Sequence, residues 1–184
     1  MKMSIDTRET QIAWAKWFVA NKGAHHFNYS EGSNRMSAIG VWPIKWPVNC
    51  DCSAFCTFIA WLGGAADPNG LNFDHEGYTG TFLSHEEHIA LWAKNHAGVN
   101  VEQVIPGDYV VYGPGTGEHI AFIVEVNGND ILTVSMGEQG DPSYVWVNTP
   151  KSNPHGYAVD GRQPQTFLRS VTASVRTPHT PPTA

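Results

Sequence analysis

All three cysteines of this 184-residue chain lie in one short stretch, NCDCSAFCTF, at residues 49–58. Cysteines at such close spacing can bind a metal, form a disulfide or provide one reactive thiol. A zinc site built from cysteine usually combines a C-x₂₋₄-C pair with a second ligand pair at its own spacing. Here Cys50, Cys52 and Cys56 form a single overlapping cluster, and the sequence has no second cysteine cluster.

Histidines could complete a metal site, and the closest candidates are His25-His26 and the two in HEEH (residues 85–88). Both pairs stand in polar stretches, where a solvated histidine is the common state. A disulfide between Cys52 and Cys56 would join consecutive turns of one helix, which requires strained geometry and constrains little. We therefore predict one reactive thiol, with no metal and no cofactor.

Cys52 is the best candidate for that thiol, because it stands where a helix is predicted to begin. The apolar residues of this helix recur at i, i+3, i+4 and i+7, at Phe55, Phe58, Ile59 and Leu62. Unsatisfied N–H groups and the helix dipole stabilise an anion at a helix start, so we expect a lowered pKa at Cys52. Cys56 is interpreted as a core residue one turn further on, and Cys50 as a bystander.

A cysteine nucleophile needs a base, and His119 is the candidate. It stands at the head of the apolar stretch HIAFIVEV, directly after a glycine-rich loop. A lone histidine in such a place is more often structural. Together with a cysteine at a helix start, however, it has the composition of a Cys–His hydrolase.

The elements that must position these residues change type along the chain. Helices are predicted over 5–23, with Asp6 as the N-cap, over 52–62 and over 84–98; residues 24–49 are predicted to be irregular. Strands follow, over 106–113, 119–126, 131–135, 143–148 and 166–171. Helices followed by an antiparallel sheet predict an α+β fold. We expect one domain over 1–171 and a Thr/Pro-rich linker tail over 172–184.

Composition excludes several classes of partner. The formal net charge is −6 with no basic run, which argues against nucleic acid and against an anionic membrane surface. No apolar run approaches the roughly 20 residues that a membrane span needs. The N-terminus MKMSIDTRE lacks the apolar segment of a signal peptide. We expect a monomer whose Thr/Pro-rich tail leads to a further module.

The stretch DCSAFCTFIAWLGG followed by PGDYVVYGPGTGEHIAFIVEV resembles the NlpC-type papain-like cysteine peptidases. Those peptidases carry a D-C-S-G-F helix start, then a P-G-D-L-V strand, then an H-V-A strand; the related CHAP amidases and peptidases share this layout. GAADPNGL, GYTGT and DGRQPQTFLR further resemble peptidase domains in endolysins of phages that infect actinobacteria. The motifs occur in the same order and span roughly residues 25–170.

This resemblance implies a papain-like fold and a peptidoglycan hydrolase. Cys52 would be the nucleophile and His119 the general base, acting on an amide bond. That bond is either the muramoyl–alanine amide or one within the peptide stem or cross-link. Asp51 and Ser53 of the D-C-S motif, and Tyr29 in HHFNYSEG, would lie on the substrate side.

The resemblance also implies where the protein acts. An endolysin without a signal peptide is made in the host cytoplasm and reaches the cell wall after holin-dependent release, with a wall-binding module following the catalytic domain. Three alternatives are kept: a catalytically degenerate wall-binding or virion-structural relative, a zinc amidase, and an acyltransferase on the same scaffold.

The third catalytic residue departs from the family's pattern. Related lysins often carry a histidine in V-S-H-G, whereas this chain reads TVSMGEQG, with Met136 in that place. Methionine cannot accept a hydrogen bond of useful strength from imidazole. Glu138, Gln139 and Ser135 are the nearby alternatives, and the absence of a third residue is another.

Hairpin geometry narrows this choice. A two-residue Asn-Gly turn would set Met136 opposite His119, whereas a four-residue loop over 127–130 would set Glu138 there. Ser135 has the wrong parity in both registers, because alternate strand residues face opposite sides. Glu138 is therefore predicted to orient the imidazole.

Overall fold

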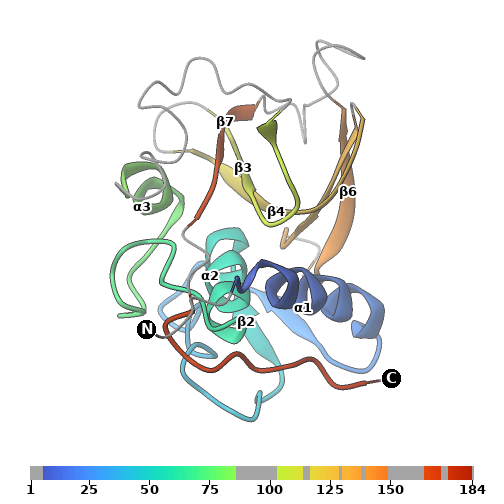
Figure 1. Cartoon of the computed structure of the whole chain (residues 1–184). Helices are drawn as coiled ribbons and strands as arrows, with labels where there is room; N and C mark the ends of the chain where they lie inside the picture. The colour runs from blue at the N-terminus through green and yellow to red at the C-terminus, as the bar shows by residue number, and fades with distance from the viewer. Residues whose placement is uncertain are drawn as a thin grey trace, which may run out of the picture.

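The computed structural model describes residues 6–85, 103–113, 117–128, 130–137, 140–148, 164–170 and 174–183. It confirms the α+β class: helices packed against one face of an antiparallel sheet (Figure 1). The first two helices lie side by side beneath the sheet, which brings the N-terminal half of the chain against the C-terminal half.

Three helices are described: α1 (Arg8–Asn21), α2 (Cys52–Leu62) and α3 (Thr79–Ser84). The limits predicted for α2 are confirmed, with Gly63 as its C-cap. The N-cap of α1 is Thr7 rather than the predicted Asp6. The Asp6 carboxylate instead accepts a hydrogen bond from the Arg8 backbone N–H at 2.9 Å, still within the first turn.

Helix α3 begins between the predicted helices over 52–62 and 84–98, where the sequence predicts no helix. Tyr78 and Thr81 form a reciprocal cap at its start, and His85 ends it in extended conformation. The helix predicted over 84–98 falls almost wholly outside the described residues. In the described part, Ser84 ends a helix instead of beginning one.

Among the described residues, five strands form the sheet: β3 (Tyr109–Tyr112), β4 (His119–Asn127), β5 (Asp130–Ser135), β6 (Ser143–Asn148) and β7 (Pro164–Leu168). Their order is β6-β5-β4-β3-β7, and every neighbouring pair is antiparallel. Each strand coincides with a predicted strand to within a few residues. Strand β4, which begins with His119, therefore occupies the centre of the sheet.

The irregular segment predicted over 24–49 contains two short strands, β1 (Phe27–Tyr29) and β2 (Val48–Cys50). They pair in parallel, with Tyr29 opposite Cys50. Three residues are too few to show an alternating pattern, so the sequence did not indicate them. Their pairing brings the segment that carries Tyr29 to the start of α2.

The main core lies between the helices and the sheet. Every residue of α2 is buried. Trp14 and Phe18 of α1 pack with Phe55 and Phe58 of α2 in the same core cluster as the sheet residues Phe122 and Val134. Cys56 is fully buried in this cluster, which confirms its interpretation as a core residue, and Cys50 is 1% exposed.

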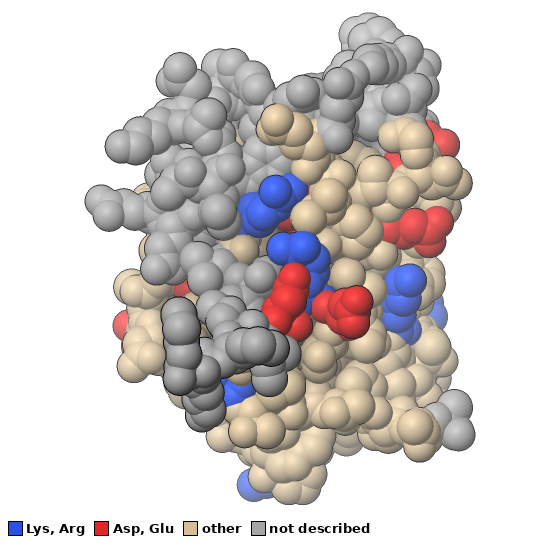
Figure 2. All heavy atoms as spheres, in the orientation of Figure 1, with Lys and Arg blue, Asp and Glu red and all other residues tan. Residues whose placement is uncertain are grey.

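The surface shows no field of one sign on the face drawn in Figure 2, where acidic and basic side chains lie interspersed. Among the described residues, no helix is long and apolar enough to cross a bilayer.

The described part of the C-terminal tail, residues 174–183, forms no helix and is packed on the helices (Figure 1). The backbone N–H of Val175 donates to the Gly64 carbonyl at 2.9 Å, and that of His179 donates to the Leu62 carbonyl at 2.8 Å. The indole of Trp14 donates to the His179 carbonyl at 2.6 Å. The described tail thus covers the C-terminal end of α2.

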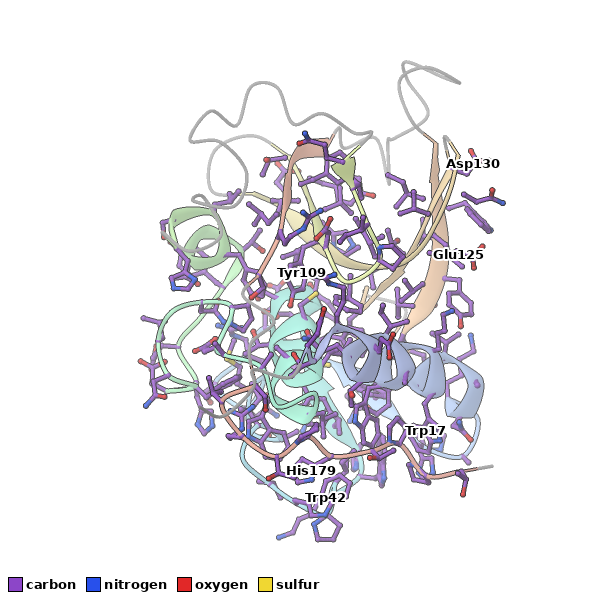
Figure 3. All side chains as sticks on the ribbon, viewed as in Figure 1. Trp17, Trp42, Tyr109, Glu125, Asp130 and His179 are labelled. Atoms are coloured by element: carbon purple, nitrogen blue, oxygen red, sulfur yellow. The ribbon has the colours of Figure 1, made fainter. Side chains whose placement is uncertain are left out.

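Side chains strengthen this attachment. The ring of His179 stacks on Trp42 with centroids 4.1 Å apart, at the end of the molecule away from the sheet (Figure 3). Arg176 lies over the ring of Phe73 at 4.5 Å and donates to the Trp61 carbonyl at 2.8 Å. These contacts are those of a packed segment rather than of a free linker.

Deletion of residues 174–184 is therefore expected to destabilise the domain. The loss of several tail hydrogen bonds and ring contacts should cost about 2–3 kcal/mol, at ~1 kcal/mol per hydrogen bond. That cost lowers the melting temperature by roughly 5–10 °C in a chain of this size. Calorimetry should show no comparable loss for deletion of 181–184 alone, which lies beyond the His179 contacts. Equal melting temperatures for both deletions would contradict a packed tail.

Candidate active site

Cys52 is the first residue of α2, and Asp51 caps that helix. The Asp51 carboxylate accepts the backbone N–H of Ala54 at 2.7 Å and the hydroxyl of Ser53 at 2.9 Å. This is the usual way in which an aspartate satisfies the orphan N–H groups of a first turn. The cap fixes the thiol at the helix start, where it is 8% exposed.

Three segments meet at this thiol. The backbone N–H groups of Ser53 and Ile120 and the hydroxyl of Thr79 form hydrogen bonds that favour its anion. Ser53 belongs to α2, Ile120 to the start of β4, and Thr79 to the start of α3. Tertiary packing thus surrounds the sulfur with donors from separate parts of the chain.

The pKa of the thiol differs from the expectation. Burial, and next the negative charge of Asp51, raise the pKa of Cys52 to about 11. The prediction of a lowered pKa is therefore wrong for the free protein, because desolvation outweighs the donors at the helix start. At neutral pH the thiol is protonated, so thiolate chemistry here requires a base to remove that proton.

His119 is the first residue of β4 and is buried, with 9% exposure. It pairs with Tyr112 of β3, and the two rings lie 5.7 Å apart. Because Ile120 donates its backbone N–H to Cys52, the structure brings the start of β4 to the thiol. The approach of the imidazole itself to the sulfur stays a prediction.

The loop before β4 shows why glycine precedes the histidine. Gly117 has φ +82°, and a Cβ there would lie 2.6 Å from Cγ2 of Thr79 and 2.8 Å from Cγ1 of Val111. A larger residue would push β4 away from α3. The glycine therefore permits the close approach that brings Thr79 and Ile120 to one thiol.

The third catalytic residue predicted from the hairpin, Glu138, lies outside the described residues, as does Gln139. Val126 pairs with Ile131, which is the pairing expected for the four-residue loop over 127–130. Asn127 also pairs with Asp130, however, so the loop is two residues long.

A bulge between Ile123 and Glu125 then shifts the register by one residue, so that Phe122 pairs with Val134. Continued from there, the register would set Gly137 opposite His119. The parity argument that favoured Glu138 and excluded Ser135 is therefore wrong, because it assumed a regular hairpin. Met136 is fully buried in the core with Val134.

The residues predicted on the substrate side lie around the same point. The Tyr29 hydroxyl donates to Glu31 at 2.8 Å. Burial, that hydrogen bond and the charge of Cys52 raise the pKa of Tyr29, which pairs with Cys50 of β2, two residues before Cys52. Asp51 and Ser53 are engaged in the helix cap. A role for these residues in substrate binding stays a prediction.

Sequence reasoning missed Arg35. Its Nη1 lies 3.2 Å from Oδ2 of Asp51 and 3.5 Å from Oγ of Ser53, and its Nη2 donates to the carbonyl of Gly77. A single arginine in an irregular segment belongs to no periodic pattern, so no local signal could have identified it.

The alternatives for the cysteines and histidines can be compared with the structure. Cys50, Cys52 and Cys56 are all free. His25 is stacked between Trp17 and Trp46, at 5.2 and 4.6 Å. Within the described ranges, no group of three or more His, Cys, Asp or Glu side chains is placed to hold a metal ion.

Comparison with known proteins finds similar solved structures, whereas no family model and no curated protein matches the chain. The peptidoglycan hydrolase RipB of Mycobacterium tuberculosis is 20% identical, with a TM-score of 0.48 over 90% of this chain and 65% of RipB. RipD of the same organism is described as a non-catalytic NlpC/p60 domain protein adapted to peptidoglycan binding. It is 16% identical, with a TM-score of 0.49 over 91% of this chain and 99% of RipD. The chain thus spans less than two thirds of RipB.

Proposed function

We propose that this chain is a cysteine-dependent peptidoglycan hydrolase that cleaves an amide bond of the peptide stem or cross-link. The observation that carries the proposal is the meeting of Cys52 at the start of α2 with the start of β4, where His119 stands. The ordered D-C-S, P-G-D and H-I-A motifs support the same assignment.

The proposed chemistry follows from these parts. His119 accepts the proton of the Cys52 thiol, and the thiolate attacks the carbonyl carbon of the amide. Backbone N–H groups at the start of α2 stabilise the oxyanion of the tetrahedral intermediate. The imidazolium then protonates the leaving amine, and water, activated by the neutral imidazole, hydrolyses the thioester and restores the thiol.

The raised pKa of the Cys52 thiol determines what His119, as the general base, must do. A thiol with a pKa of about 11 holds its proton at neutral pH, so His119 must accept that proton for the sulfur to attack. Substrate that displaces water from the site would strengthen the hydrogen bonds from Ile120 and Thr79 to the developing thiolate.

A second candidate is a non-catalytic wall-binding or virion-structural relative. Two observations favour it: Met136 replaces the histidine of V-S-H-G and is buried in the core, and the resting thiol is protonated. The two candidates differ in their products. An enzyme releases soluble peptides from walls, whereas a binding protein co-sediments with walls that stay intact.

Digestion of purified actinobacterial walls tests the proposal. Turbidity should fall, iodoacetamide should stop the loss, and chelation with EDTA should leave it unchanged. Sensitivity to the chelator instead would indicate the zinc amidase. Mass spectrometry of the released peptides identifies the bond, and intact walls with bound protein would indicate the non-catalytic alternative.

We further infer an endolysin role, with synthesis in the host cytoplasm, holin-dependent release and a wall-binding module after the tail. The motifs GAADPNGL, GYTGT and DGRQPQTFLR support it. The charge of −6 offers no attraction to an anionic wall, which is a reason for a separate binding module. Lysis of whole cells by the chain alone, compared with a fusion to such a module, tests this role.

A further inference from the structure

Arg35 connects three segments that bound the thiol. From the loop between β1 and β2 it reaches the cap of α2, with Nη1 at 3.2 Å from Oδ2 of Asp51 and 3.5 Å from the hydroxyl of Ser53. Its Nη2 donates to the carbonyl of Gly77, in the segment that leads into α3. One guanidinium therefore contacts both sides of the site.

The contact with Asp51 is electrostatically significant because both side chains are shielded from water. The Arg35 side chain is 16% exposed and that of Asp51 is 14% exposed. Charges in such surroundings are screened far less than charges at the surface. The Asp51 carboxylate stands directly before Cys52 and disfavours its anion, and the Arg35 guanidinium lies 3.2 Å from that carboxylate.

The contact with Gly77 fixes the backbone that leads into α3. Two residues after Gly77 stands Thr79, whose hydroxyl hydrogen-bonds the sulfur of Cys52. The Asn69 side chain also packs against Gly77, where an added Cβ would lie 2.1 Å from Cγ of Asn69. Arg35 and Asn69 together hold the entry to α3 in place.

We propose that Arg35 is a positioning residue of the thiol site, which offsets the charge of Asp51 and holds Thr79 against Cys52. The inference deepens the proposed function and rests on it for its catalytic meaning. The effect of Arg35 on the reactivity of the Cys52 thiol can be measured without any substrate.

Other titratable groups also face the thiol. Tyr29 approaches from β1, Cys50 from β2 and Cys56 from within α2, and each has a pKa raised by burial above its usual range. These three are neutral between pH 7 and 9. His119 stands next to Ile120 at the start of β4, and Glu31 lies behind Tyr29. Asp51 is the charged residue that acts on the pKa of Cys52, and Arg35 is its ion-pair partner.

The test is the rate of alkylation of Cys52 by iodoacetamide between pH 7 and 9, with the modified residue identified by mass spectrometry. Arg35→Met should reduce the thiolate fraction by about tenfold, for a pKa increase of about one unit. Higher intrinsic nucleophilicity of a more basic thiolate offsets part of that loss. We expect a rate about threefold lower than that of wild type, and an intermediate rate for Arg35→Lys.

A double variant separates this role from a structural one. Asp51→Asn keeps a good helix cap and removes the carboxylate charge. If Arg35 acts on Cys52 through that charge, Arg35→Met/Asp51→Asn should alkylate faster than Arg35→Met, because the carboxylate that Arg35 offsets is gone. An unchanged rate in Arg35→Met, or a double variant as slow as Arg35→Met, would overturn the proposal. Melting temperatures identify any variant that is merely unfolded.

The outcome is independent of the hydrolase assignment. Loss and recovery of thiol reactivity without any wall hydrolysis would retain the role of Arg35 and reject the proposed enzyme. Wall hydrolysis together with alkylation rates that neither substitution changes would retain the proposed enzyme and reject the role of Arg35.

Discussion

Cys52→Ala is expected to lose all measurable hydrolysis of purified cell walls, a reduction of at least about 10³-fold. The sulfur is the only atom at this helix start that can form the covalent intermediate, and the neighbouring hydroxyl of Ser53 is engaged with Asp51. The variant should fold normally, because the thiol is a small group at the edge of the core. Turbidity of a wall suspension, with circular dichroism as the fold control, measures both effects.

The other two cysteines provide matched controls. Cys50→Ser and Cys56→Ser should keep most of the activity, since neither thiol is placed at the helix start. Cys56 is fully buried, so its replacement puts a hydroxyl into an apolar cluster at a cost of about 1–3 kcal/mol and lowers the melting temperature. Activity near the wild-type level in Cys52→Ala would reject the mechanism proposed here.

Arg169→Met is expected to have the largest effect on stability. Arg169 donates from Nε to Oδ1 of Asp108 at 2.9 Å and from Nη2 to Oδ2 at 3.0 Å, and Asp108 is fully buried. This pair joins the start of β3 to the end of β7. Removing the cation leaves a buried carboxylate without its ion-pair partner, which costs about 3–5 kcal/mol. At 2–4 °C per kcal/mol, the melting temperature should fall by roughly 6–20 °C.

The pH dependence of this loss has a defined sign. Burial raises the pKa of Asp108 above its usual value even with Arg169 present, so the folded state favours the protonated form. Without the Arg169 guanidinium, the folded state favours the protonated form of Asp108 more strongly. The destabilisation in Arg169→Met should therefore be full at neutral pH and shrink as the pH falls through the pKa of Asp108.

Two controls complete this experiment. Asp108→Asn/Arg169→Met should be less destabilised than Arg169→Met, because the amide carries no charge. Lys16→Met removes a cation from an exposed position on α1 and should change stability by no more than about 0.5 kcal/mol. Similar melting temperatures for Arg169→Met and Lys16→Met would show that the buried pair contributes nothing.

Local sequence patterns predicted the elements that carry the candidate nucleophile and base. The i, i+3, i+4, i+7 spacing after Cys52, with glycine following, predicted the limits of α2, because a buried helix needs an apolar face at that period. Alternation and turn residues located β3 to β7 and placed His119 at a strand start. These signals are local, so one sequence suffices to interpret them.

Only the tertiary structure decided the chemistry of the thiol. The pKa of Cys52 depends on its burial and on Asp51, while Ile120 and Thr79 reach it from distant segments. Arg35 contacts Asp51 across 16 positions of sequence. Such contacts arise from packing and leave no periodic trace in the chain.

The same distinction explains the other differences. The bulge in β4 changes which residues face His119, and a single extra residue in one strand cannot be recognised from hydrophobic alternation. The Thr/Pro-rich composition of the tail predicted a linker but could not indicate that its described part packs, because Trp42 and Trp14, which contact His179, lie far away in sequence. By itself, the sequence determined that Cys52 begins a helix and that His119 begins a strand. Packing determined what surrounds them, and desolvation and charge at the packed site set their reactivity.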